Sequence, residues 1–480
     1  MTLPRQRSAS VPPGASRRLR SRFAEWSWRV FAMAGALAAA HASAAVDNAQ
    51  EPPPRRPNII FILADDLGYG DLASFGQKKI QSPHLDRLAR EGTRFTNTYA
   101  GAPVCAPSRC VLLTGLHTGH ARIRDNNPDV GGELEPFGEG GVRLSLTISD
   151  QTIAEVLQSA GYITGAAGKW GLGEPGSAGT PRKHGFDDWL GYLNQNHAVY
   201  YYTDFLWRND KRQPIPENAD GKRGVYSNDL FRDFALKFLE RHRREPFFLY
   251  LPVTIPHNRM EVPSLGEYAD KDWPEEAKIY AAMVARLDVY VGEILAGLDR
   301  WGLAENTLVV FTSDNGAVRG ERSNFLRSSG ALRGTKGTLY EGGIRVPMIV
   351  RWPGHVPAGR VSDAPWGFVD IFPTFAALAG ATIPDDLDGC DITPALLGKK
   401  AGAKDRYIYW EFPRDHLWQA ARHGRWKAVR FGPDQPLELY DLAADPGETR
   451  NVAASNPAVV ADLARYMDQE HTPSPHWPAK

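Results

Sequence analysis

Five apolar runs of strand length recur along the chain, and longer amphipathic stretches separate them. The runs cover residues 58–64, 162–167, 247–253, 307–312 and 346–351. The stretches that suit amphipathic helices cover 84–91, 152–160, 229–241, 275–298 and 371–378. Strands that alternate with helices are typical of α/β units, whose parallel strands are buried on both faces. We therefore predict an α/β protein with a mostly parallel central sheet flanked by helices.

The chain has 480 residues, enough for one large core and a second, smaller domain. Residues 45–57 are rich in proline and polar side chains, which predicts a linker before the α/β domain at 58–398. Further strand-like pieces cover 407–412, 419–430 and 437–442, and a helical stretch covers 458–469. They predict a small C-terminal α+β subdomain with an antiparallel sheet, residues 399–480.

Residues 1–44 have the layout of a cleaved export signal. Arginines without lysines precede an apolar stretch at 30–40, and Ala42-Ser43-Ala44 suits a signal peptidase. We therefore predict export to the periplasm or the medium. A disordered tail or a lone membrane anchor is the alternative, although the apolar stretch is short for a bilayer. Residues 16–19 weakly resemble a twin-arginine signal, so the export route stays open.

The charge balance and the cysteine count narrow the function classes. Lysine plus arginine and aspartate plus glutamate both total 56, so the formal net charge is zero. The protein has no net positive charge that would attract nucleic acid or an anionic membrane, and we expect neither as a partner. The three cysteines are Cys105, Cys110 and Cys390. An exported protein stabilised by disulfides usually has an even number, so one cysteine is expected to have another role.

Polar side chains follow four of the predicted strands. They are Asp65 and Asp66 after the first, Lys169 after the second, His257 after the third, and Asp314 and Asn315 after the fourth. Because ligands in open α/β sheets bind beyond the carboxyl ends of the strands, we expect one site there. Its oxygen ligands favour calcium or magnesium over zinc. Taken singly, the two acidic motifs are also typical of a helix N-cap and a tight turn.

The segment Cys105-Ala106-Pro107-Ser108-Arg109 is the most informative one. Pro107 suits the first turn of a helix that continues from Arg109 to about residue 116. Cys105 would then lie just before a helix N-terminus, where free amides and the helix dipole favour an anion. The residues alone leave two interpretations: a small buried cysteine, or a thiolate nucleophile activated at the helix end.

Together these motifs resemble the type I sulfatases. Cys-x-Pro-Ser-Arg followed by a Leu-Thr-Gly run is that family's signature, and other motifs agree in order and spacing from about residue 57 to residue 451. These motifs lie at 58–68, 168–170, 255–257, 313–316, 332–337, 341–347, 439–442 and 445–448. The resemblance implies an alkaline-phosphatase-like large domain with a small C-terminal subdomain. It also implies that a separate generating enzyme oxidises Cys105 to formylglycine.

The resemblance further implies the roles of the site residues. One calcium ion would be held by Asp65, Asp66, Asp314 and Asn315, with residue 105 as a further ligand. A hydroxyl of the hydrated formylglycine, a gem-diol, would attack sulfur, and the second hydroxyl would then expel sulfate. Lys169 and Lys336 would stabilise the sulfuryl oxygens, His257 would protonate the leaving alcohol, and Arg109 would hold the formylglycine region in place.

The chain departs from the family at one position. The family often reads Gly-Lys-Trp-His-Leu-Gly, whereas this chain has Gly171 in place of the histidine. That histidine is the usual candidate to accept the proton of the second hydroxyl, so the role passes to another group or to water. His117 and His120 would reach the site only if the chain turns back after the helix.

The substrate expected from the resemblance is a sulfated small molecule or glycan. Aromatic and amide side chains at 189–207 suit a sugar ring, or else form a packed surface segment. With residues 116–120, this segment resembles a bacterial subgroup that includes carbohydrate sulfatases, and we predict that His197 contacts substrate. Two other functions stay open: a phosphoester or phosphonate hydrolase of the same superfamily, and a sulfoglycan-binding protein whose Cys105 is never converted.

Overall fold

A computed structural model describes residues 56–134, 142–399 and 406–478. The predicted export signal and nearly all of the predicted linker lie outside these residues. Among the described residues, no helix has both the length and the apolar character needed to cross a membrane.

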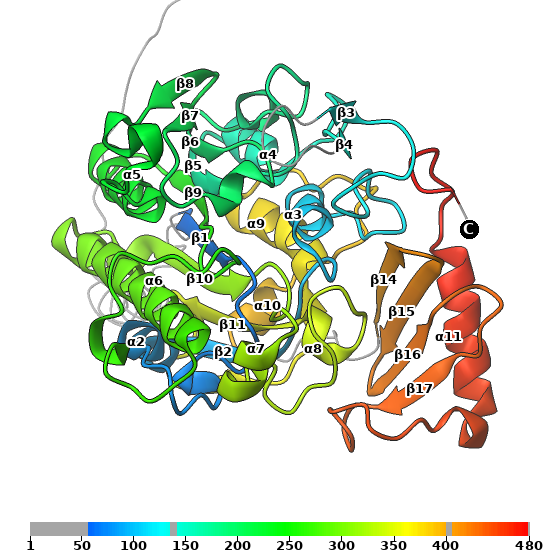
Figure 1. Ribbon diagram of the computed structural model, residues 1–480. Coiled ribbons are helices and arrows are strands. Elements are labelled where there is room, and N and C mark those ends of the chain that lie inside the picture. The colour runs from blue at the N-terminus through cyan, green and yellow to red at the C-terminus, as the bar shows by residue number, and fades with distance from the viewer. Residues whose placement is uncertain (1–55, 135–141, 400–405, 479–480) are drawn as a thin grey trace, which may run out of the picture. The chain divides into compact units, whose positions relative to one another are not determined.

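An eleven-stranded sheet forms the centre of the fold (Figure 1). Its order is β12 (Arg360–Ser362), β2 (Thr93–Tyr99), β11 (Arg345–Arg351), β10 (Thr307–Ser313), β1 (Asn58–Ala64), β9 (Phe247–Pro252), β5 (Ile163–Lys169), β6 (Asp188–Tyr192), β7 (Phe205–Arg208) and β8 (Lys211–Pro214), with β13 (Trp366–Gly367) beside β2. Strands β10, β1, β9, β5 and β6 run parallel. The mostly parallel sheet is therefore confirmed, although the fifth predicted strand, β11, pairs antiparallel with β10.

Helices cover both faces of this sheet because the central strands are apolar on both sides. On one face lie α3 (Cys105–Thr114), α4 (Ile153–Ser159) and α9 (Ile371–Ala379), and on the other lie α2 (Pro83–Glu91), α5 (Ser227–Arg241) and α6 (Glu275–Arg300). Short helices are α7 (Glu321–Leu326), α8 (Glu341–Ile344) and α10 (Thr393–Leu396). All five predicted helices of the large domain are present within a few residues of their expected ends.

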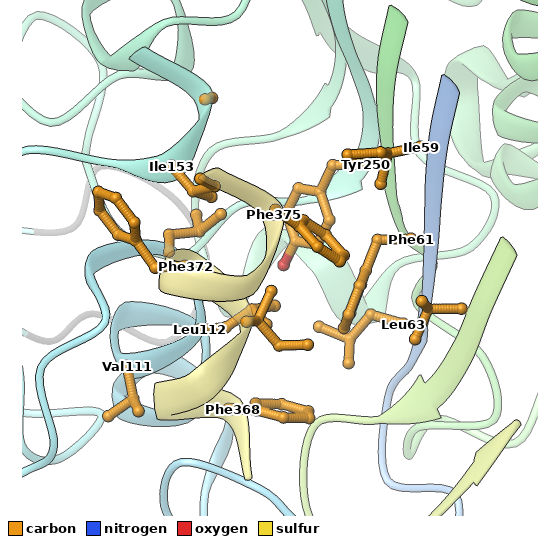
Figure 2. Close-up of a cluster of buried hydrophobic side chains, with 14 of the residues drawn as sticks. Ile59, Phe61, Leu63, Val111, Leu112, Ile153, Tyr250, Phe368, Phe372 and Phe375 are labelled. Atoms are coloured by element: carbon orange, nitrogen blue, oxygen red, sulfur yellow. The ribbon is translucent and has the colours of Figure 1, made fainter. Parts of the chain in front are cut away.

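The alternation of β1 builds the two cores. Phe61 and Leu63 face the helices α3 and α9, where Figure 2 shows them beside Leu112 and Phe375. The ring centroids of Phe61 and Phe375 are 6.1 Å apart at an interplanar angle of 70°. Ile62, one residue away, belongs to the opposite core. Burial of each such side chain contributes about 1.5–3 kcal/mol to the free energy of folding. Because β1 is apolar on both faces, this burial favours a position in the middle of the sheet.

A second, four-stranded antiparallel sheet follows in the chain and belongs to the same compact unit (Figure 1). It consists of β14 (Tyr407–Pro413), β15 (Leu417–His423), β16 (Trp426–Arg430) and β17 (Glu438–Asp441), with α11 (Pro457–Gln469) against it. The stretch 419–430, predicted as one strand-like piece, is divided between β15 and β16. Gly424 has φ +57, a left-handed value that a tight turn needs and glycine adopts at little cost.

A buried ion cluster joins the two sheets. Lys427 on β16 is fully buried, and its Nζ lies 2.9 Å from both Glu341 Oε1 and Glu448 Oε1. Glu341 begins α8, which precedes β11 of the large sheet. Separating the two sheets would leave these buried charges unpaired, which is very costly. The cluster therefore favours one position of the small sheet against the large one.

Candidate active site

The polar groups that follow β1 and β10 meet at one edge of the sheet, because the two strands run parallel and end side by side. The backbone N–H of Asp66 donates to Asp314 Oδ1 at 3.1 Å. Asn315 Nδ2 donates to Asp66 Oδ1 at 2.7 Å. Asp65 and these three residues are at most 1% exposed. Four oxygen-bearing side chains are therefore held together in the interior.

Cys105 lies beside this acidic group. It is the first residue of α3, whereas the sequence predicted that it lies just before the helix. Its Sγ is 3.5 Å from Asp65 Oδ1 and 3.3 Å from Lys336 Nζ. The N–H of the next residue, Ala106, donates to the side chain of Asn126. Burial raises the pKa of the Cys105 thiol to about 12. This disfavours the thiolate interpretation.

Three cationic side chains balance the three carboxylates. Lys169 Nζ lies 2.8 Å from Asp65 Oδ2, and Lys336 Nζ lies 2.7 Å from Asp66 Oδ1. Arg109 Nη2 lies 2.8 Å from a carboxylate oxygen of the aspartate after β10, and its Nη1 donates to Lys169 O at 2.6 Å. Because these charges cancel, a bound divalent cation would leave two positive charges for an anionic substrate.

His257 forms a pair with Lys336. Its Nε2 lies 3.2 Å from Lys336 Nζ and 3.4 Å from Asp66 Oδ2. Tyr201 Oη donates to the backbone oxygen of His257 at 2.7 Å, which fixes the loop after β9. Burial lowers the pKa of His257 to about 4. Burial opposes the charge of Lys336, but Asp66 and Cys105 outweigh it and raise its pKa. Burial therefore favours a neutral imidazole beside the charged lysine, and the role of His257 as an acid stays a prediction.

The oxygen ligands fit a hard cation. Asn315 Oδ1 is buried and has no hydrogen-bond partner among the described residues, while its Nδ2 is held by Asp66. Burial raises the pKa of Asp314 to about 6, and the nearby Asp65 adds to this. A divalent ion would satisfy the orphan oxygen and offset this repulsion, and an all-oxygen donor set suits calcium.

The sulfatase family model matches residues 57–381. This chain belongs to the sulfatase family. The model of the N-sulphoglucosamine sulphohydrolase C-terminal region matches residues 335–472 of this sulfatase. The chain is thus a sulfuric ester hydrolase, and its large domain has the alkaline-phosphatase-like architecture that the motifs implied.

Relatives span nearly the whole of this sulfatase. Human arylsulfatase A is 34% identical over 86% of this chain and 87% of its own length. N-acetylgalactosamine-6-O-sulfatase of Bacteroides thetaiotaomicron is 31% identical over 89% of this chain and 95% of its own length. The crystal structure of Ps i-CgsB in complex with k-i-k-neocarrahexaose has a TM-score of 0.77 at 31% identity, covering 89% of this chain and 95% of that one.

Gln195 belongs to the predicted aromatic and amide segment 189–207, but the sequence did not single it out. Gly171 lies just beyond the end of β5 and has a left-handed φ of +75. A Cβ on Gly171 would lie 2.7 Å from Gln195 Nε2, so the amide fills that space. Gln195 Nε2 is buried and has no hydrogen-bond partner among the described residues. The glycine at 171 and the amide-rich segment after β6 were the available signals.

The predicted histidines of the substrate segment and the α3 loop lie elsewhere. His197 Nε2 is 2.8 Å from Thr203 Oγ1, and the ring packs against Tyr192 and Phe205. Burial lowers its pKa to about 4. A substrate contact of His197 stays a prediction. His117 and His120 gather with two carboxylates in a separate cluster, because α3 ends at Thr114 and the chain turns away.

Proposed function

We propose that this sulfatase cleaves sulfate esters of carbohydrates, with formylglycine made from Cys105 as the nucleophile and one calcium ion. The observation that carries the proposal is the position of Cys105 at the start of α3, in contact with both Asp65 and Lys336. Two similar proteins support the substrate class: one is named for N-acetylgalactosamine-6-O-sulfate, and the other is bound to a neocarrahexaose. Residues 1–44 support export.

The calcium ion and the formylglycine would supply two kinds of chemistry. Calcium, held by Asp65, Asp66, residue 105, Asp314 and Asn315, would make a hydroxyl acidic near neutral pH and offset sulfuryl charge. The hydrated aldehyde would offer one hydroxyl to attack sulfur and a second whose deprotonation releases sulfate, a route that a plain thiol lacks.

The remaining steps belong to side chains of this chain. Lys169 at the end of β5 and Lys336 in the loop before α8 both contact the acidic cluster. They would bind the sulfuryl oxygens as charge develops on them. Arg109, fully buried against Asp314, would keep the start of α3 in place. A proton from the pair of Lys336 and His257 would pass to the leaving alcohol oxygen.

Gln195 adds a donor beside Gly171. An amide cannot serve as a base, so the proton of the second hydroxyl would leave through another group or water. The free Nε2–H would instead donate to an oxygen of the bound ester. Among the described residues, the active-site edge offers a single group of oxygen ligands, which suits a sulfate monoester better than the more highly charged phosphate monoester.

The tryptic peptide 95–109 tests the proposal directly. In protein made together with a formylglycine-generating enzyme, we expect its mass to be lower than that of the unmodified peptide by about 18 Da, with a carbonyl that hydrazides trap. The same peptide from protein made without that enzyme is the control. If active protein carries only unmodified cysteine, the nucleophile is wrongly assigned. If the protein carries only unmodified cysteine and binds a sulfoglycan without turnover, the binding-protein function is favoured instead.

Calcium removal gives a second test. Chelation is expected to lower kcat/KM by about 100-fold or more, because the cation supplies several kcal/mol of charge stabilisation. The midpoint of thermal unfolding should fall as well, since the buried carboxylates of Asp65, Asp66 and Asp314 lose their counter-ion. Calcium should restore both quantities. Full activity in a preparation shown by elemental analysis to lack calcium would contradict the cofactor assignment.

A further inference from the structure

The motif at 116–120 is not used by the active site. Gly115 ends α3 with a left-handed φ of +71, and the chain then folds so that His117 and His120 stack with ring centroids 4.3 Å apart. Gly119 lies against the end of α11, where a Cβ would be only 2.2 Å from Glu470 O. A residue without a side chain thus lets two segments far apart in sequence touch.

Two carboxylates complete this group. His117 Nε2 is 2.9 Å from Glu470 Oε2, and His120 Nδ1 is 2.8 Å from Asp388 Oδ1. One ligand atom from each of the four residues lies within 4.8 Å of the others. They come from three segments: the loop after α3, the loop between α9 and α10, and the residue after α11.

The backbone holds this arrangement in advance. Asp388 N–H donates to Gly115 O at 3.1 Å, and Asp388 Oδ2 accepts from the His117 N–H at 2.8 Å. Asp388 Oδ1 is thereby left to face His120. The side chain of His117 is 7% exposed and that of His120 is 33% exposed, so the group is half-buried with an open side. An ion can enter there without unfolding.

We infer that His117, His120, Asp388 and Glu470 form a second metal site that takes a zinc ion. Two imidazoles and two carboxylates are a nitrogen and oxygen donor set, unlike the all-oxygen calcium set of the active site. With neutral histidines the group carries two negative charges, which one divalent cation cancels.

Zinc binding requires that the proton on each ligating ring nitrogen move elsewhere. His117 Nδ1 now accepts from the Gly119 N–H at 3.1 Å, so its Nε2 carries the proton and donates to Glu470. Zinc at Nε2 would move that proton to Nδ1, which then gives up the bond from the Gly119 N–H and faces Asp388 Oδ2 at 3.6 Å. Zinc at His120 Nδ1, which now lies 2.8 Å from Asp388 Oδ1, would likewise move a proton to Nε2 of that ring. A metal-bound histidine whose other nitrogen donates to a carboxylate is the usual arrangement. The ion would tie α11 to the loop that leaves α3, the helix carrying Cys105.

Zinc titration of the whole mature protein tests the site. With calcium saturating the active site, we expect one zinc ion per chain by calorimetry and elemental analysis, and a higher thermal unfolding midpoint. His120→Ala and Glu470→Gln change half-exposed side chains, and each should weaken zinc binding by about 100-fold or more. His416→Ala, at an exposed histidine outside the cluster, should change nothing.

The outcome does not depend on sulfate ester hydrolysis, because the readouts are stoichiometry and stability. Wild-type protein that binds no zinc, or variants that bind it as well as wild type, would overturn the proposal. The group would then be an ion-pair network between the histidines and the carboxylates.

Discussion

Replacing Cys105 with alanine is expected to abolish sulfate ester hydrolysis, with kcat/KM falling by about 10⁴-fold or more. The variant lacks the atom from which the nucleophile is made, while Lys169, Lys336 and the oxygen ligands stay in place. Substrate can still bind to these cations. The loss should therefore be in kcat, with little change in KM, measured with a chromogenic aryl sulfate and a sulfated sugar.

Cys390→Ala is the matched control, because Cys390 is exposed and lies far from Cys105 in sequence. It should keep wild-type activity. The thermal unfolding midpoint of the Cys105→Ala variant should stay close to wild type, since alanine fits the space of the small buried residue. Its calcium affinity should fall, because residue 105 is one of the five proposed ligands. If Cys105→Ala retains more than about one hundredth of the activity, residue 105 is not the nucleophile.

His257→Ala is expected to act in a way that depends on the leaving group. For sugar sulfates, whose alkoxide leaves poorly, kcat should fall by about 10²–10⁴-fold, because proton transfer to the leaving oxygen is lost. For nitrophenyl sulfate, whose phenolate leaves without a proton, the fall should be much smaller. Parallel kinetics on both substrates measure the difference.

Two further variants separate proton transfer from positioning. Lys336→Ala should impair both substrates, because Lys336 also contacts Asp66 and Cys105. His416→Ala, at an exposed histidine, should leave both unchanged. An equal loss on sugar and aryl esters in His257→Ala would mean that the histidine holds Lys336 in place and does not take part in proton transfer.

Much of the candidate site could be anticipated because parallel strands end at a common edge. The apolar runs predicted β1 and β10, and their parallel pairing brings Asp65, Asp66 and Asp314 together. The helix after Cys105 followed from Pro107 and the apolar residues beyond it. These are local signals, since strand length, helix caps and turn residues depend on near neighbours in the chain.

Other features depended on contacts between distant segments. The break at Gly424 lay inside a stretch whose alternation continues on both sides, so only the pairing of His423 with Trp426 reveals the hairpin. Gln195 gained its position because β6, the strand before it, pairs with β5 and because Gly171 leaves space. Neither contact has a periodic signal in the sequence.

The sequence alone therefore determined the α/β class, the sulfatase family and the candidate oxygen ligands, because each depends on residue type at short spacing. The tertiary structure decided which cation meets which carboxylate, that Lys336 lies beside His257, and that His117 and His120 meet Asp388 and Glu470. Burial and distance set these properties, and both arise only when segments hundreds of residues apart pack together.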